Sequence, residues 1–165
     1  MKKTVIALML ALVAGSASAQ NLNLDRSGPY VGANIGTVKD SDGRSLLGAV
    51  AGYQVNPYLR LEGAYDYTNL NGKNGQTLVV NAVPQYRIPG TVVTPYVLAG
   101  AGYAWDGLGK TNSDAATVYN LGVGVRVGLS AAWEFDARYR YLNKFDNDFT
   151  DRETQTVSAG LTYRF

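Results

Sequence analysis

Residues 133–141 read WEFDARYRY, and this stretch decides the fold. Apolar and aromatic side chains occupy every second position, namely Trp133, Phe135, Ala137, Tyr139 and Tyr141. Charged side chains occupy the positions between them, namely Glu134, Asp136, Arg138 and Arg140. Successive side chains of a β-strand point to opposite faces, so this period of two predicts a strand with one aromatic and one charged face.

Seven further stretches repeat the alternation, each about ten residues long: 29–38, 45–55, 58–67, 77–87, 95–105, 117–127 and 156–165. Polar connections of alternating length separate the stretches. Residues 39–45, 68–76, 106–115 and 143–153 form mostly longer connections, whereas those near 56–57, 89–90 and 129–131 are short. An up-and-down antiparallel meander produces such alternation. The sequence therefore predicts an all-β fold, an eight-stranded antiparallel up-and-down barrel.

The first 19 residues have the pattern of a cleaved secretory signal peptide. Two lysines precede an apolar run over residues 5–14, and Ala17 and Ala19 form the A-x-A cleavage pattern. The apolar run is too short for a transmembrane helix, which needs about 20 residues. We expect a signal peptide at 1–19, a short periplasmic segment at 20–28 and the barrel at 29–165.

The composition excludes several kinds of chemistry. The chain has no cysteine, so it cannot form a disulfide framework, a thiolate metal site or a lipid-modified cysteine. It has no histidine, so the Ser-His-acid and His-Asp sites of hydrolases cannot form. Without the two signal-peptide lysines, 13 basic residues balance 13 acidic ones, and nucleic acid is not an expected partner. We expect neither an enzyme nor a cofactor.

Periodicity alone leaves two orientations open. A soluble lipocalin-like barrel would turn its apolar positions inward, whereas a membrane barrel would turn them to lipid and line its lumen with polar groups. Strands of about ten residues match a tilted crossing of the hydrocarbon layer and exceed the usual globular strand. Aromatic residues such as Tyr53, Trp105 and Trp133 lie near the ends of the apolar stripes, as expected at membrane interfaces. These features favour a transmembrane barrel.

Three segments carry a family resemblance: AGYQVNPYLRLEGAYDY at 51–67, EFDARYRY at 134–141 and Tyr163-Arg164-Phe165 at the end. They resemble the small outer-membrane β-barrel proteins of Gram-negative bacteria, in the opacity-protein, neisserial surface protein A and outer membrane protein X-like group. The resemblance implies an outer-membrane location and a final strand, ending in Tyr163 and Phe165, that the barrel-assembly machinery reads. The chain is expected to lack the periplasmic peptidoglycan-binding domain of outer membrane protein A. This fold hosts adhesins, enzymes and channels alike, so function stays open.

In the membrane orientation, the charged positions meet inside the barrel. Glu134 and Asp136 share a face with arginines that begin two residues after Asp136, and ion pairing would hold the carboxylates charged. The predicted lumen network comprises Arg60, Glu62, Asp66, Arg87, Arg126, Glu134, Asp136, Arg138, Arg140 and Arg164. We expect this network to fill the barrel as a structural plug, because an unpaired buried charge costs several kcal/mol. An ion-conducting or gated lumen is the alternative.

Two function classes remain. The first is a surface interaction protein, adhesin- or antigen-like, that contacts a host or surface ligand through residues 39–45, 68–76, 106–115 and 143–153. The second is a small passive channel, porin-like, for ions or small solutes. The other expected partners are outer-membrane lipid and lipopolysaccharide, around a monomer. Asp146, Asp148 and Asp151 could offer oxygen ligands to Ca²⁺, but they lack the EF-hand spacing, so we expect a solvated acidic loop.

Overall fold

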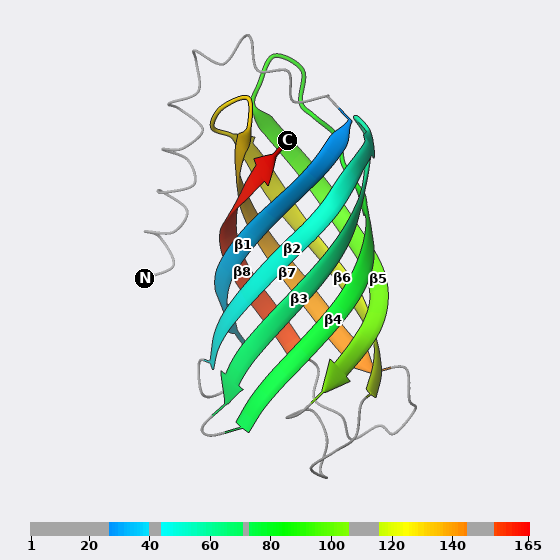
Figure 1. Cartoon of the computed structure of the whole chain (residues 1–165), viewed down its shortest axis with the longest axis vertical. Helices are drawn as coiled ribbons and strands as arrows, with labels where there is room; N and C mark the ends of the chain where they lie inside the picture. The colour runs from blue at the N-terminus through cyan, green and yellow to red at the C-terminus, as the bar shows by residue number, and fades with distance from the viewer. Residues whose placement is uncertain (1–26, 40–43, 71–72, 106–115, 145–153) are drawn as a thin grey trace.

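The structure is a computed structural model that describes residues 27–39, 44–70, 73–105, 116–144 and 154–165. These residues form eight strands (Figure 1). The strands are β1 (Gly28–Val38), β2 (Arg44–Asn56), β3 (Leu59–Leu70), β4 (Lys73–Pro84), β5 (Val93–Trp105), β6 (Ala116–Gly128), β7 (Trp133–Lys144) and β8 (Thr154–Arg164). Within these residues, no helix is long and apolar enough to cross a membrane.

The eight strands form a closed barrel in chain order. Each strand pairs antiparallel with the next, and β8 returns to β1 with Ala33 opposite Leu161. The predicted all-β, eight-stranded, up-and-down barrel is therefore confirmed. The strands run for 11 to 13 residues, slightly longer than the alternation in the sequence indicates.

The short connections, the start of β1 and the C-terminus lie at one end of the barrel (Figure 1). We call this the termini end and the opposite one the loop end. The amide of Phe165 donates to the carbonyl of Pro29 at 3.2 Å, which brings the last residue beside the start of β1. In the connection between β6 and β7, the amide of Trp133 donates to Ser130 Oγ at 3.1 Å. Gly90, with φ of 74°, turns the chain between β4 and β5.

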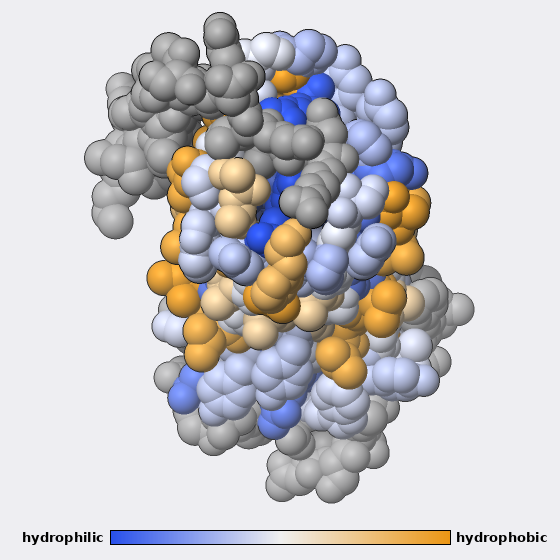
Figure 2. Space-filling model, turned by 45° about the horizontal axis from the view of Figure 1, so that its top comes forward, coloured by the Kyte–Doolittle hydropathy of each residue, from blue (hydrophilic) through white to orange (hydrophobic). Residues whose placement is uncertain are grey.

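The apolar parity of every strand faces outward. Ile35 on β1 is 69% exposed and Val80 on β4 is 67% exposed. Figure 2 shows such apolar side chains around the flank, with hydrophilic groups in the opening at the termini end. Val127 departs from this pattern, because it lies on the outer parity but is only 7% exposed. Its neighbours in register are Val93 and Phe135, whose side chains are partly buried beside it.

Inward-facing glycines let neighbouring strands come close together. A Cβ added at Gly102 on β5 would collide with the backbone of Leu78 and Val79 on β4. At the outward-facing Gly63, the nearest atom to an added Cβ is the carbonyl oxygen of Ala51, at an ordinary 3.7 Å. The close approach of β4 therefore requires a glycine at position 102, whereas position 63 has room for a Cβ.

We therefore expect Gly102→Ala to lower the free energy of unfolding by about 1–3 kcal/mol, since backbone cannot move aside as a flexible side chain can. Gly63→Ala is the matched control and should be neutral or slightly stabilising, because glycine weakens a strand interior. Urea unfolding in lipid vesicles measures both. Equal unfolding midpoints for the two variants would contradict the close approach at Gly102.

Candidate functional site

The candidate site is the charged interior of the barrel. Nine charged side chains, all buried, converge there from four strands: Arg60, Glu62 and Asp66 on β3, Arg126 on β6, Glu134, Asp136, Arg138 and Arg140 on β7, and Arg164 on β8. All nine occupy the parity opposite the outward apolar stripe. The strand alternation that produces the apolar exterior therefore also determines where these charges lie.

The cluster nearest the termini end centres on Glu134. Arg60 binds it through two contacts, Nη1 to Oε2 at 2.8 Å and Nη2 to Oε1 at 2.9 Å. Arg164 adds a third, Nη1 to Oε1 at 3.1 Å. The guanidinium of Arg60 also donates from Nε to Gln54 Oε1 at 2.9 Å and lies 4.9 Å from the ring centroid of Tyr30. The planar fork of arginine suits this shared, two-sided pairing.

A second cluster lies around Asp136 in the middle of the barrel. Its two oxygens bind Arg138 Nε at 2.7 Å and Arg126 Nε at 3.1 Å. The hydroxyl of Tyr96 donates to the same carboxylate at 3.0 Å. Nη1 of Arg138 also binds Glu62 Oε1, at 2.7 Å. One guanidinium therefore links two carboxylates, and the four charged groups form a continuous chain.

Toward the loop end, fewer charged side chains face the interior of the barrel. Arg140 Nη1 binds Asp66 Oδ2 at 2.7 Å, and Asn120 Nδ2 donates to Asn81 Oδ1 at 2.8 Å. Several buried polar atoms here have no hydrogen-bond partner in the described part of the chain; they belong to Asn34, Asp66, Asn81, Asn120, Arg140, Thr156 and Ser158. Because buried polar groups are normally satisfied by protein or ordered water, this half of the interior is suited to water.

Three of the ion pairs cross the barrel rather than follow its wall. They join Arg60 to Glu134, Glu62 to Arg138, and Asp66 to Arg140. In every case one partner lies on β3 and the other on β7, which are four strands apart in a closed ring of eight. The partners are thus on opposite walls. We call these pairs cross-braces, and they span the interior at successive depths.

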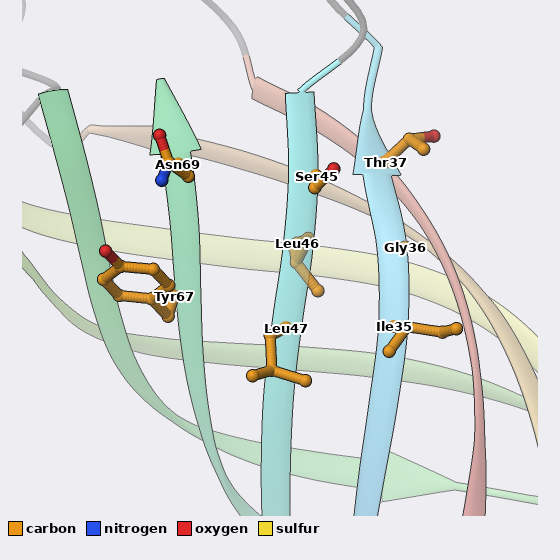
Figure 3. Close-up of a pocket in the computed structure, with 8 residues that line it drawn as sticks. All are labelled: Ile35, Gly36, Thr37, Ser45, Leu46, Leu47, Tyr67 and Asn69. Atoms are coloured by element: carbon orange, nitrogen blue, oxygen red, sulfur yellow. The ribbon is translucent and has the colours of Figure 1, made fainter. Parts of the chain in front are cut away.

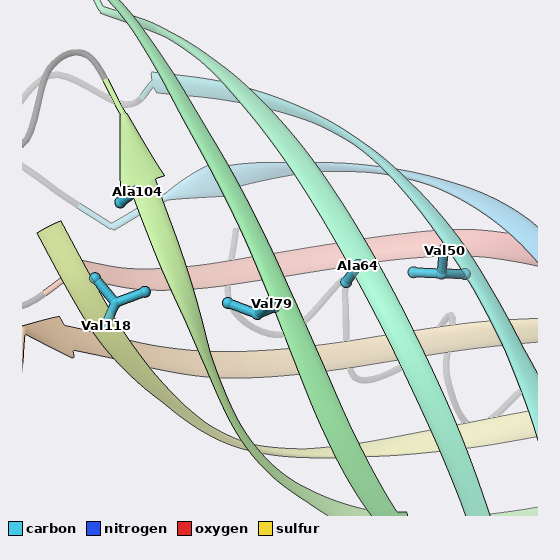
Figure 4. Packing of buried hydrophobic residues seen from close by; sticks show 5 residues of the cluster. All are labelled: Val50, Ala64, Val79, Ala104 and Val118. Carbon is cyan, nitrogen blue, oxygen red and sulfur yellow. The ribbon is translucent and has the colours of Figure 1, made fainter. Parts of the chain in front are cut away.

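The interior also contains an apolar cluster that sequence reasoning missed. Figure 4 shows its members on consecutive strands: Val50, Ala64, Val79, Ala104 and Val118. They share the inward parity with the charges, and partly buried Leu142 packs against them. The signal was present in the sequence, because Val50, Val79 and Val118 occupy positions of the polar parity. The lumen is therefore part polar network and part apolar packing.

Arg87 lies beyond the end of β4 at Pro84, in the connection to β5, where it is half-buried. Its Nε donates to the carbonyl of Thr91 at 3.4 Å. It shares its parity with Gln85, which is buried and binds Arg126 at 2.6 Å. The membership of Arg87 in the network stays a prediction.

Tyr163 and Phe165 lie at the termini end, where Tyr163 packs edge-on against Trp133 and Phe165 at centroid distances of 5.1 and 5.0 Å. Their role as an assembly signal stays a prediction. Ala17, Ala19 and the acidic residues of 145–153 lie outside the described residues. Within the described ranges, no three acidic, histidine or cysteine side chains are grouped as for a metal ion.

Comparison with known proteins identifies the family. The model of the outer membrane protein beta-barrel domain matches residues 6–165. Outer membrane protein A of Yersinia pseudotuberculosis is 29% identical over the whole of this chain. The chain spans only about half (56%) of that curated relative.

Solved structures show the same fold. Neisserial surface protein A matches with a TM-score of 0.69 and 23% identity, over 84% of this chain and 98% of that one. The attachment invasion locus protein Ail of Yersinia pestis matches with a TM-score of 0.58 and 22% identity, over 86% and 99%. The outer membrane enzyme PagL also matches, with a TM-score of 0.53 and 16% identity, over 82% and 99%. Identities this low show a shared fold and leave activity open.

The pair between Glu62 and Arg138 gives a direct test of the cross-braces. Arg138→Met should lower the free energy of unfolding by about 3–5 kcal/mol, because it leaves a buried carboxylate without its partner. Adding Glu62→Gln removes that unpaired charge, so the double variant should be less destabilised than the sum of the single variants. Urea unfolding of all four proteins in vesicles gives the coupling energy. Additivity within about 0.5 kcal/mol would contradict the pairing.

Proposed function

Because this chain belongs to the outer membrane protein beta-barrel domain family, and so lies in the outer membrane of a Gram-negative bacterium, we propose that it is a surface interaction protein with a plugged lumen. The observation that carries the proposal is the set of ion pairs between β3 and β7, which occupy the space that a solute would need. If no solute passes through the interior, the connections at the loop end are the part that would contact a ligand, because loops on a rigid scaffold commonly carry function.

Charge limits the kind of ligand that the loops would bind. Residues 39–45, 68–76, 106–115 and 143–153 together contain six basic and eight acidic side chains. Ail, whose fold this chain shares, has been solved in complex with the heparin analogue sucrose octasulfate. An excess of acidic groups does not favour such a polyanion. We therefore propose a neutral or basic partner, such as a protein surface, for these loops.

An enzymatic role has little support, although an enzyme shares the fold. The chain has no histidine to serve as general base. The buried carboxylates Glu62, Glu134 and Asp136 are each bound by at least one arginine within 3.1 Å. Such pairing favours the charged carboxylate, whereas a general acid must carry a proton. A passive channel is the second candidate, favoured by the unpartnered polar atoms toward the loop end.

Conductance separates the plug from the channel. The unmodified protein in planar bilayers should show little or no steady conductance. Replacing Glu134 and Asp136 with alanine removes the carboxylates that bind Arg60 and Arg126, so water and anions should enter. Conductance should rise and favour anions while thermal stability falls.

The matched control removes two carboxylates outside the described strands, through Asp151→Ala with Glu153→Ala. It changes the net charge equally and should leave conductance unaltered. A large, stable conductance in the unmodified protein that the interior double variant does not change would favour the channel over the plug.

The loops are tested in a deletion strain. Wild-type protein should restore any lost adhesion or serum resistance, and a variant with residues 143–153 replaced by Asn-Gly, which joins the paired residues Leu142 and Thr154, should not. That replacement joins β7 to β8 with a turn suited to a hairpin, so the barrel should still fold and show its heat-modifiable gel shift. A deletion that causes only envelope leakage, cured equally by both proteins, would contradict an interaction role.

A further inference from the structure

The outer wall of the barrel has a groove near the loop end of β1, β2 and β3 (Figure 3). Its volume is about 570 Å³, and its walls include Ile35, Thr37, Ser45, Leu47, Tyr67 and Asn69. Two rows of cross-strand neighbours form the groove. The first row consists of Ile35, Leu47 and Tyr67, and the second consists of Thr37, Ser45 and Asn69. The groove therefore follows from strand register and does not depend on the connecting loops.

Polarity changes along the groove toward the loop end. Ile35 and Leu47, which are 69% and 58% exposed, provide apolar walls on the side of the barrel middle. The next row offers two hydroxyls and an amide, and Figure 3 shows these groups closer to the strand ends. Lys39, also exposed, follows two residues after Thr37. The order from the barrel middle outward is thus apolar, hydrogen-bonding and then cationic.

The apolar part of the groove is continuous with the outward stripe that a membrane barrel presents to lipid. Long connections of such barrels lie outside the cell and short turns in the periplasm, so this groove faces the outer leaflet. A lipid in that leaflet meets a barrel wall in the same order: acyl chain, then head group. A row of three hydrogen-bonding side chains suits a hydroxyl-bearing sugar, and a lysine beyond it suits a phosphate.

We propose that this groove binds one phosphorylated, acylated sugar lipid of the outer leaflet. An acyl chain packs between Ile35 and Leu47. The sugar hydrogen-bonds to Thr37, Ser45 and Asn69, and Lys39 pairs with a phosphate. The proposal rests on family membership for the membrane.

Native mass spectrometry of the full chain, released from phosphatidylcholine nanodiscs with or without lipid A, tests the site. The unmodified protein should retain one lipid A molecule. Ser45→Phe fills the groove with a ring and should weaken retention about tenfold, equivalent to about 1.4 kcal/mol. Thr117→Phe is the matched control and should retain lipid A normally, because Thr117 is an exposed residue near the loop end of β6, paired with Tyr103 away from the groove.

The heat-modifiable gel shift establishes that each variant is folded, and Lys39→Gln, outside the strands, gives a second reading if Ser45→Phe does not fold. Lower retention in Lys39→Gln supports the phosphate contact. Equal retention of lipid A by the unmodified protein and both groove variants would overturn the site. Equal retention of phosphatidylglycerol in a parallel nanodisc would overturn the assignment to a sugar lipid.

Discussion

Arg138 lies between Asp136 on its own strand and Glu62 on the opposite wall, and the closed ring confines it there. A guanidinium in a narrow interior has lost most of its water, and only carboxylates at contact distance offset that cost. The same requirement applies to Arg60, Arg126 and Arg140, each bound to a carboxylate within 3.1 Å. The number of strands sets how far apart the walls stand, and these side chains pair across that distance. The outward stripe, the register and the plug are all compatible with one arrangement of charge.

The sequence predicts much of this architecture because strand alternation is a local property. The alternation in WEFDARYRY predicts the two faces of this strand. The same alternation in seven other stretches predicts a barrel of eight strands. The ion-pair partner of each charged side chain is harder to predict, because it depends on which strands lie opposite one another once the barrel has closed. From sequence, Glu134 and Asp136 are expected to pair with Arg138 and Arg140, which lie nearby on the same face. Asp136 does bind Arg138, at 2.7 Å, whereas Glu134 binds Arg60 and Arg164.

Other differences have equally specific causes. Arg87 lies beyond the last residue of β4, so it is only half-buried, although the alternation of the strand continues to it. Val127 is covered by its neighbours in register, which periodicity cannot show. The apolar interior cluster was overlooked because the polar parity was represented by its charged and glycine positions.

The cross-braces also constrain how the barrel is made. Their partners lie 74 or 76 residues apart in the chain, so no hairpin contains both charges of a pair. A half-built sheet would expose Glu62 and Asp66 of β3, or Arg140 of β7, without the partners that they bind in the closed barrel. Such long-range contacts form late, because chain entropy must be lost before they contribute. Entry of the charged face into the membrane is therefore coupled to closure of the ring, and insertion strand by strand meets an electrostatic barrier that concerted insertion avoids.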